Sequence, residues 1–460
     1  MAHWRDTWLA ELPDLVRPDY PPALGRDLSA LTQFAQHHHG DLPHPGLAAL
    51  PRTSGDVQRI IRLARRDGVN VVPRGGGSGV MQGIWAGEDS VVLDLSAMTT
   101  LGPLDAENGR IIVGAGLNLM SLETSLQSQG WTLGHWPQSI SLATIGGLIA
   151  TKSIGQYSAR YGGIEDMVRE IEVVLGCGDI VRIGSQAPRR SLGPELLPLF
   201  IGSEGTLGVI AEAALKVRPL PQANRHAAFT HADFSQGLSA LQRWMLAGLT
   251  PALVRLYDPA ETARTFAQAK GSLLLAIFEG TAKTITPQIE EALELSRPCG
   301  VPADPGLVAQ WLATRNDVGA WAPLLQQGYL VDTIEVAGTW SILPDLYETI
   351  VRESHALAGV IGLTGHTSHV YADGANLYFT FLAHPQSPDQ AEALYREIWS
   401  TAMNAALRLG ATVSHHHGVG RIRREWMARE RREELPWLLQ IRKIFDPDGI
   451  LNRGALWPNF

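Results

Sequence analysis

The glycine-rich segment at residues 73–79 constrains the fold of this chain more than any other feature. It reads Pro-Arg-Gly-Gly-Gly-Ser-Gly and directly follows the apolar run that ends at Val72. Because glycine has no Cβ, consecutive backbone N–H groups in such a loop can converge on an anion. The segment is not an ATP-binding P-loop, since neither Lys-Ser nor Lys-Thr follows it, and its glycine spacing differs from the Rossmann fingerprint. It therefore predicts a strand-to-loop junction that binds a large ligand carrying phosphate.

Length, charge and cysteine content exclude several function classes. The chain has 460 residues, which is too long for one compact core and indicates two or three domains. The net charge of -8 argues against nucleic acid as a main partner, so a phosphate must be neutralised locally. Cys177 and Cys299 are the only cysteines, which is typical of a reducing, cytoplasmic location. No apolar run reaches the length of a membrane span, and peripheral contact with a membrane stays open.

Hydrophobic periodicity predicts alternating helices and strands. Residues 54–68 have a helical pattern, with Ser54 as the N-cap and Gly68 at the end. The turn at residues 176–179 predicts a hairpin between its two flanking strands. Strands are expected at residues 71–72, 91–95, 110–113, 171–175, 180–183, 209–217, 273–278 and 377–381.

A composition break at Arg218-Pro-Leu-Pro221 predicts a domain boundary. The expected organisation is an N-terminal extension (1–47), a first domain (48–220), a second domain (221–430), and a C-terminal helix and tail (431–460) that returns to the first domain.

Two further glycine-rich stretches lie in the first domain. Residues 137–153 combine hydroxyl and amide side chains with two adjacent glycines, and residues 202–210 run from a glycine turn into a strand. Any one of these stretches could be a plain tight turn. Three in one domain, each beside a strand, favour a shared extended ligand. A dinucleotide fits this pattern, because separate protein segments are needed to contact its pyrophosphate and its two ends.

The order of these three stretches resembles the FAD-binding domain of the vanillyl-alcohol-oxidase superfamily, over residues 48–220. The resemblance implies an α+β fold, with a two-subdomain PCMH-type FAD-binding domain and an α+β substrate (cap) domain that contains an antiparallel sheet. It also implies FAD as the cofactor, with its pyrophosphate on the first loop. Many relatives attach FAD through a histidine in that loop, whereas this chain has Ser78 there, so FAD is expected to bind non-covalently, with His135 as a remote exception. The implied cofactor-binding residues are Pro73, Arg74, Gly75, Gly76, Gly77, Ser78, Gly79, Gln138, Ser139, Ser141, Thr144, Gly147, Thr151, Ser153, Glu204, Gly205, Gly208, Val209 and Ile210.

Three consecutive histidines, His415 to His417, form the second informative stretch, followed by Gly-Val-Gly and, further on, Trp426. They could pool zinc ligands with His366 and His369, form a solvated run, or perform acid–base and polar binding work beside a flavin. On extended backbone the first and third imidazoles face one side and the second faces the other, which weakens a zinc cluster on one face.

This stretch resembles alkylglycerone-phosphate synthase, the ether-lipid member of the superfamily, which carries a triple histidine, Gly-Val-Gly, a basic pair and tryptophan. The resemblance implies exchange of an acyl ester for an alkyl ether on dihydroxyacetone phosphate, through a covalent adduct at the flavin N5. The implied catalytic residues are Tyr378, Arg255, His415, His416 and His417, and the implied substrate-binding residues are Arg315 and Arg421.

The chemistry of these side chains suggests their roles. Arg255 can grip a carboxylate or phosphate in a bidentate fork. Tyr378 can move a proton at the substrate carbon if nearby positive charge lowers its pKa, and His416 or a neighbour can supply that charge. Arg421 and Arg423 are candidates for contact with an anionic head group. Each residue also has a plainer interpretation as an ion pair, a core tyrosine or a solvated face.

The same region resembles, more distantly, FAD-dependent D-2-hydroxyacid dehydrogenases of the D-lactate and D-2-hydroxyglutarate type. Metal-dependent members carry a second histidine and a glutamate where this chain has Tyr378 and His416, so no metal is expected. The alternative function is therefore FAD-linked oxidation of a small D-2-hydroxy acid, with arginine binding the carboxylate and histidine taking the hydroxyl proton. Family analogy also predicts a homodimer and a small-molecule or lipid-phosphate substrate.

Overall fold

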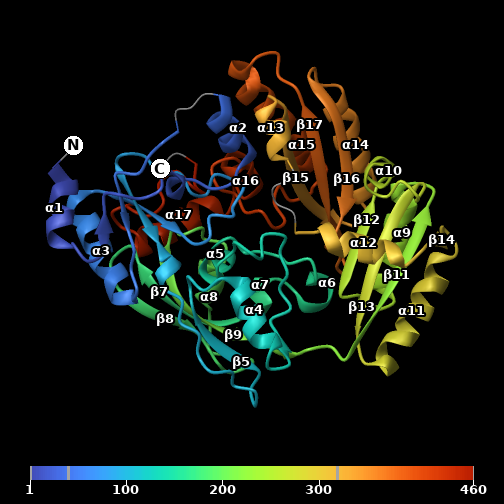
Figure 1. The fold of residues 1–460 in the computed structure, drawn as a ribbon, viewed down its shortest axis with the longest axis horizontal. Coiled ribbons are helices and arrows are strands. Elements are labelled where there is room, and N and C mark those ends of the chain that lie inside the picture. Colours follow the sequence, from blue (N-terminus) through green and yellow to red (C-terminus); the bar gives the residue numbers. More distant parts are fainter. Residues whose placement is uncertain (1–2, 39–41, 317–320, 459–460) are drawn as a thin grey trace.

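Four β-sheets organise the chain, and the computed structural model describes residues 3–38, 42–316 and 321–458. Figure 1 shows the sheets of the first half, coloured blue to green, beside the large sheet of the second half, coloured yellow to orange. The mixed helix and sheet content and the antiparallel sheets confirm the predicted α+β class. The exact domain boundaries stay a prediction.

A mostly parallel four-stranded sheet carries the first glycine loop. Its order is β1-β2-β4-β3, and only the β1–β2 pair is antiparallel. The loop leaves the carboxyl end of β3, as the sequence predicts. The strands are β1 (Val16–Arg17), β2 (Leu47–Ala49), β3 (Asn70–Arg74) and β4 (Ser90–Asp94).

Helix α3 (Ser54–Asp67) connects β2 to β3 as predicted. Its N-cap is Thr53 and not the predicted Ser54, because Thr53 and Asp56 form a reciprocal capping box. Gly68 ends the helix in the left-handed conformation, with φ at 68°.

An antiparallel sheet, in the order β5-β9-β7-β8, forms the second layer of the first half. The predicted hairpin is the β7–β8 pair. The strands are β5 (Arg110–Gly114), β7 (Val168–Leu175), β8 (Ile180–Gly184) and β9 (Gly208–Lys216), and β6 (Trp131–Thr132) pairs separately with β10 (Arg218–Pro219). The helices here are α4 (Leu119–Gln127), α5 (Ile145–Ala150), α6 (Ser158–Tyr161), α7 (Ile164–Met167) and α8 (Leu197–Phe200).

A seven-stranded antiparallel sheet, in the order β14-β11-β13-β12-β16-β17-β15, dominates the second half. Its strands are β11 (Ala223–His231), β12 (Leu253–Tyr257), β13 (Ser272–Gly280), β14 (Gly300–Pro302), β15 (Leu330–Thr339), β16 (Val360–Thr367) and β17 (Gly374–Ala383). The helices are α9 (Phe234–Leu246), α10 (Pro259–Thr265), α11 (Ala282–Ser296), α12 (Gly306–Thr314), α13 (Ala322–Gln326), α14 (Leu343–His355) and α15 (Ala391–Arg408).

The two faces of this sheet serve different cores. On β13, Leu274 and Ala276 pack into the core that includes residues of α9, α14 and α15. Leu273 and Leu275, which point the opposite way, join the core that the sheet shares with the first half. One face of the sheet is therefore turned toward the glycine loops.

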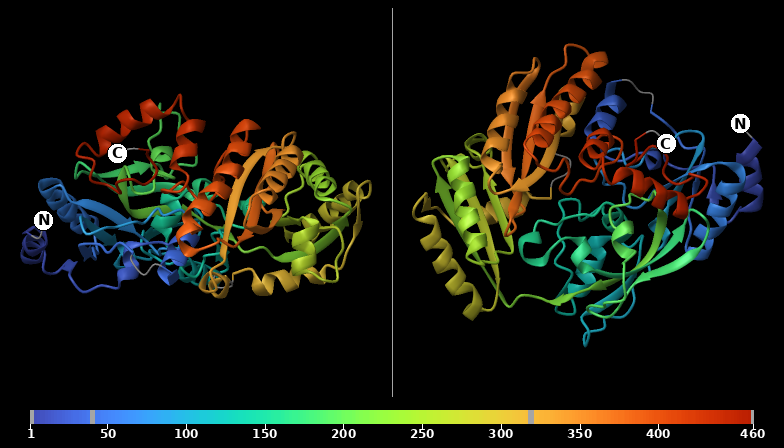
Figure 2. Two further views of the ribbon diagram at one scale, coloured as in Figure 1. Left: turned by 90° about the horizontal axis from the view of Figure 1, so that it is seen from above. Right: turned by 180° about the vertical axis from the view of Figure 1, so that it is seen from behind.

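The ends of the chain connect the two halves (Figure 2). Phe34 of α2 (Ala30–His38) packs into the core of the large sheet, and α1 (His3–Glu11) lies beside the first sheet. After α16 (Arg424–Glu430) and α17 (Leu435–Phe445), the C-terminal tail runs beside β3, where the Val71 N–H donates to the Ile450 carbonyl at 2.8 Å. No helix in the described ranges has both the length and the apolarity needed to cross a membrane.

Candidate active site

The three glycine-rich stretches meet at one place. A Cβ on Gly76 would overlap a backbone carbonyl of the second stretch, and a Cβ on Gly75 would overlap the Thr144 hydroxyl. A Cβ on Gly205, in the third stretch, would lie 2.9 Å from the ring of Pro73. Only glycine permits such close approach. The second and third stretches therefore pack directly on the first loop.

The first loop leaves backbone donors available for a ligand. Among the hydrogen bonds of the described residues, none is donated by the N–H groups of residues 75–79. Beside them, Thr144 Oγ1 is buried without a hydrogen-bond partner. Polar groups in a protein interior need partners, and a row of free N–H groups suits a pyrophosphate. The residues present therefore fit FAD.

Several other predicted cofactor residues have partners within the protein. Arg74 donates to the Arg26 carbonyl at 2.8 Å, so its guanidinium is already used. Thr151 Oγ1 donates to the Gly147 carbonyl at 2.9 Å, and Ser153 Oγ lies 3.2 Å from a ring nitrogen of the buried His135. Three predicted cofactor residues of the third stretch lie at the start of β9 and pair with β7. They are Gly208, Val209 and Ile210.

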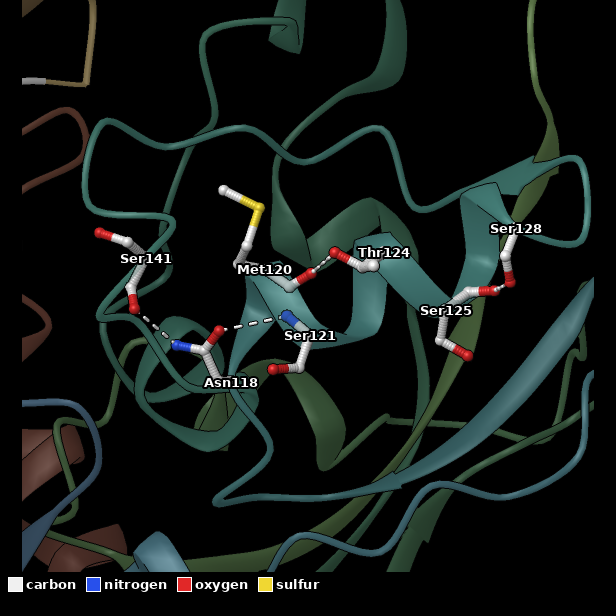
Figure 3. Close-up of a pocket in the computed structure, with 7 residues that line it drawn as sticks. All are labelled: Asn118, Met120, Ser121, Thr124, Ser125, Ser128 and Ser141. Atoms are coloured by element: carbon white, nitrogen blue, oxygen red, sulfur yellow. Dashed lines mark hydrogen bonds between the residues drawn. The ribbon is translucent and has the colours of Figure 1, made fainter.

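The predicted residues of the second stretch do not all face inward. Ser141 lies at the rim of a hydroxyl-rich pocket beside α4, where its carbonyl accepts a hydrogen bond from Asn118 Nδ2 at 2.9 Å (Figure 3). Gln138 is exposed and Ser139 half-buried, and the Ser139 carbonyl accepts the N–H of residue 142 at 2.9 Å. Contact of these residues with FAD stays a prediction.

Glu204 fastens the third glycine stretch to the histidine segment. Its buried carboxylate accepts the N–H groups of Val419 and Gly420, at 2.6 and 2.9 Å. A Cβ on Gly418 would lie 2.8 Å from the same carboxylate. The predicted cofactor residue thus holds the Gly-Val-Gly turn against the first half.

The backbone of residues 411–420, the histidine segment, is bent, so the alternation of imidazoles that an extended backbone would give does not apply. Residues 411–420 contain turns and bends, with one bridge between Thr412 and Ala337. The three imidazoles therefore gather, with ring centroids 5.1 Å apart for His415 and His416 and 4.4 Å apart for His416 and His417.

A buried ion pair produces this bend. The carboxylate of Glu335, on β15, accepts the backbone N–H groups of His415 and His417, the latter at 3.0 Å. Arg423 donates to the same carboxylate and to Ser414 Oγ, the latter at 2.8 Å. Both charged side chains are 0% exposed. Arg423 is therefore not available for an anionic head group, which corrects the expectation from sequence.

Tyr378 occupies the centre of the site. Its position on β17 lies opposite Glu335 on β15 and His366 on β16. Its ring stacks on His366 at a centroid distance of 4.6 Å and on His416 at 5.7 Å. Arg255 Nη2, from β12, lies 2.6 Å from His366 Nε2. The fold thus gathers the predicted tyrosine, arginine and histidines from four separate segments.

The two remaining predicted arginines lie in different places. Arg255 and Arg315 flank Trp311, with their guanidinium carbons 5.2 and 5.6 Å from its ring centroid. Arg315 also donates to the Tyr157 hydroxyl at 3.1 Å. The guanidinium of Arg421, in contrast, donates to a carbonyl of the C-terminal tail. The structure therefore brings Arg315, but not the guanidinium of Arg421, beside Arg255.

Burial decides the protonation of the site. It raises the pKa of Tyr378 to about 12, and the opposing effect of the Arg255 charge is smaller. Burial also lowers the pKa of His415 and of His417 to about 4, and that of His416 well below its ordinary value. The condition of a lowered tyrosine pKa is therefore not met, and the neutral His416 does not supply the positive charge at pH 7.

Three imidazoles could in principle hold a metal ion. Ring nitrogens of His369, His415 and His416 lie within 4.8 Å of one another. Two nitrogens of these imidazoles have protein partners, because Ser158 Oγ lies 2.7 Å from His369 Nδ1 and the Tyr371 hydroxyl lies 2.9 Å from His415 Nε2. Operation without metal stays a prediction.

Sequence analysis missed the residues that position this site. Glu335 and Ser158 belong to no motif, and Tyr371 begins the segment 371–381 that resembles the family's tyrosine strand but was assigned no role. Glu335 gave only a weak signal, since it stands between Ile334 and Val336 in a segment that also contains Asp332 and Thr333.

Comparison with known families supports the same interpretation. A model described as an FAD binding domain matches residues 45–184, and a model described as the C-terminal domain of FAD linked oxidases matches residues 220–456, more than half of the chain.

Relatives with similar sequences extend over nearly the whole chain. The uncharacterized FAD-linked oxidoreductase YgcU of Escherichia coli K12 is 33% identical, covering 91% of this chain and 90% of its own. Alkyldihydroxyacetonephosphate synthase of Dictyostelium discoideum is 30% identical, over 90% of this chain and 73% of its own, and D-lactate dehydrogenase of Archaeoglobus fulgidus is 28% identical, over 88% and 90%. A solved alkyldihydroxyacetonephosphate synthase has the same fold, with a TM-score of 0.80, 24% identity and coverage of 97% of this chain and 84% of its own.

Proposed function

Because the chain belongs to the FAD-linked oxidase family and is therefore an FAD-dependent enzyme, we propose that it exchanges an acyl ester for an alkyl ether on dihydroxyacetone phosphate. The observation that carries this proposal is Tyr378, stacked between His366 and His416 on the wall that also holds Arg255. In metal-dependent hydroxyacid dehydrogenases a histidine and a glutamate take the positions of Tyr378 and His416.

The residues of the site have complementary proposed roles. Arg255 supplies a fixed positive charge for the carboxylate or phosphate of the substrate. Tyr378 stays protonated and presents a hydroxyl, while the neutral imidazoles, His416 first among them, accept a proton from the substrate carbon. His415 and His417 are held in place through their backbone by Glu335. Arg315 lies where it can orient the same anionic group.

FAD, when bound, supplies an electrophilic ring for bond exchange or hydride acceptance. We propose that the N–H groups of residues 75–79 and the Thr144 hydroxyl hold its pyrophosphate, without a covalent link.

A second candidate is oxidation of a small D-2-hydroxy acid. A fixed guanidinium beside neutral imidazoles also suits a carboxylate and the proton of its neighbouring hydroxyl. The similarity to a D-lactate dehydrogenase supports this alternative.

One pair of measurements separates the two functions. The FAD-loaded enzyme is mixed anaerobically with D-lactate, D-2-hydroxyglutarate or glycolate, and flavin absorbance is followed. Separately, labelled fatty alcohol is incubated with acyl-dihydroxyacetone phosphate and enzyme. We expect no bleaching and incorporation of label. Bleaching of the flavin without incorporation of label would contradict the exchange reaction and support oxidation of a D-2-hydroxy acid.

A further inference from the structure

A cavity of about 860 Å³ opens beside His415, and it is lined by residues of the first half together with Tyr371, Ser414 and His415 of the second half. Its inner end is lined by Tyr371, Ser414 and His415, and the Tyr371 hydroxyl lies 2.9 Å from His415 Nε2. A ligand in this cavity therefore reaches the edge of the candidate active site.

Positively charged side chains outnumber negatively charged ones in the lining of the same cavity. Its acidic lining residues are Glu165 and Asp166. Its basic lining residues are Lys152, Arg160, Arg169, Arg189, Lys216 and Arg218. This surplus of cations stands in a chain whose net charge is -8, so it is a local feature and not a general field.

These basic side chains form no close ion pairs, although Asp166 acts on Lys216 and Arg218 at longer range. Among the described residues, no salt bridge involves any of the six basic side chains. Arg182, on the same sheet, shows the contrast, because it contacts the carboxylates of Glu170, Glu172 and Glu212 at 3.2, 2.8 and 3.1 Å. The carboxylates of this sheet are thus gathered at one arginine, away from the cavity.

Backbone geometry holds the cations close together. A register shift between Val168 and Glu170 leaves Arg169 unpaired in the ladder with β9, and such bulges redirect a side chain. Burial lowers the pKa of Lys216, the charges of Arg218 and Arg169 lower it further, and the charge of Asp166 opposes this shift. Like charges held in proximity are relieved by an anion.

We propose that this basic cavity binds the phosphate group of a phosphate monoester and directs the rest of the ligand toward Tyr371 and His415. A phosphate carries close to two charges and accepts several hydrogen bonds, which suits clustered arginine and lysine. A second cavity, of about 530 Å³ beside α4, is lined by uncharged side chains and lacks this character (Figure 3). The identity of the ligand's carbon skeleton rests on the proposed function. The anion site rests only on the residues that line the cavity.

Titration calorimetry on the FAD-loaded protein tests the site, with inorganic phosphate and glycerol 3-phosphate as probes. We expect saturable binding that weakens at least tenfold in the double variant Lys216→Gln/Arg218→Gln. Lys443→Gln, an exposed lysine on α17, is the matched control and should change affinity less than twofold. Arg169→Gln is a second test if the double variant loses its flavin or its circular dichroism spectrum.

The source of the phosphate is decided by a second arm. Sedimentation with phosphatidylcholine vesicles, with and without phosphatidic acid, shows whether a lipid headgroup is bound. Loss of soluble or vesicle binding in the variants supports the site and assigns its ligand. Equal binding by variants and wild type, or no saturable binding to any probe, overturns it. If phosphate binds but no alkyl exchange occurs, the proposed exchange reaction is contradicted and the anion-site proposal is still supported.

Discussion

At Tyr378, burial and charge act on the same phenol in opposite directions. Arg255 favours the phenolate, yet desolvation is larger and keeps the hydroxyl protonated. The same desolvation keeps His415, His416 and His417 neutral. At neutral pH the site therefore pairs a protonated phenol with neutral imidazoles.

Removing the phenol hydroxyl tests this pairing. Tyr378→Phe keeps the ring that stacks on His366, so FAD should bind normally while turnover falls about 10²–10⁴-fold. Steady-state kcat on the substrate identified above is the measurement. Tyr329→Phe, at a tyrosine that packs on His384, is the control and should retain full activity. Turnover near wild type would assign Tyr378 to packing alone.

His135 gives a pH test outside the proton-transfer residues. Burial lowers its pKa from 6.5 to about 3. Folding lowers this pKa, so protons bind the unfolded chain more readily than the folded protein. The free energy of unfolding is therefore highest above pH 6.5 and decreases as the pH falls toward 3. The stability of wild type relative to His135→Gln should therefore fall by about 1.4 kcal/mol per pH unit below pH 6.5. Urea unfolding of both proteins at several pH values between 7.5 and 5 measures the difference, and a pH-independent difference would contradict it.

At the scale of elements, the bent histidine segment depends on one buried ion pair. Glu335 belongs to a strand and Arg423 to the turn before α16, and together they hold Ser414 and the backbone of His415 and His417. The pair does not need to add net stability in order to fix a conformation. Removing only one of the two charged side chains nevertheless lowers the free energy of unfolding, because the charge of its partner stays buried without compensation.

Arg423→Met leaves the carboxylate of Glu335 without its partner. We expect a loss of about 3–5 kcal/mol in the free energy of unfolding, measured by urea titration. Arg396→Met, which breaks the exposed pair with Glu392 on α15, should cost less than about 1 kcal/mol. Equal effects of the two substitutions would show that the buried pair does not hold the segment.

At the scale of the whole molecule, the two halves share one hydrophobic core. That core joins Ile111 and Ile149 of the first half to Leu253 and Leu275 of the large sheet. Glu204 adds hydrogen bonds from the first half to the turn after the histidines. Local unfolding of one half therefore lowers the stability of the other half.

FAD binding should stabilise both halves together. At a free concentration one hundred times its Kd, FAD adds about 2.7 kcal/mol to the folded state, so the FAD-free protein should melt at a lower temperature in one transition. Differential scanning calorimetry with and without FAD measures this. Acid precipitation of the holoprotein should release all the flavin to the supernatant, and flavin retained in the pellet would contradict non-covalent binding.

Local features were readable from the sequence because neighbours in the chain determine them. The helix over 54–68, the β7–β8 hairpin and the need for glycine at residues 75–77 follow from periodicity, turn chemistry and the missing Cβ. The triple histidine and Tyr378 were identified through family resemblance, and the fold places them together.

Tertiary structure alone decided how these parts meet and in which protonation state. Glu335 and Arg423 are 88 residues apart in the chain, and Glu204 lies 215 residues before Val419, so no local pattern links them. The bend of the histidine segment arises from the buried Glu335–Arg423 pair, and the high pKa of Tyr378 arises from its burial. Burial depends on residues far apart in sequence, so the chain alone determined which groups are present, while packing determined their charge and their contacts.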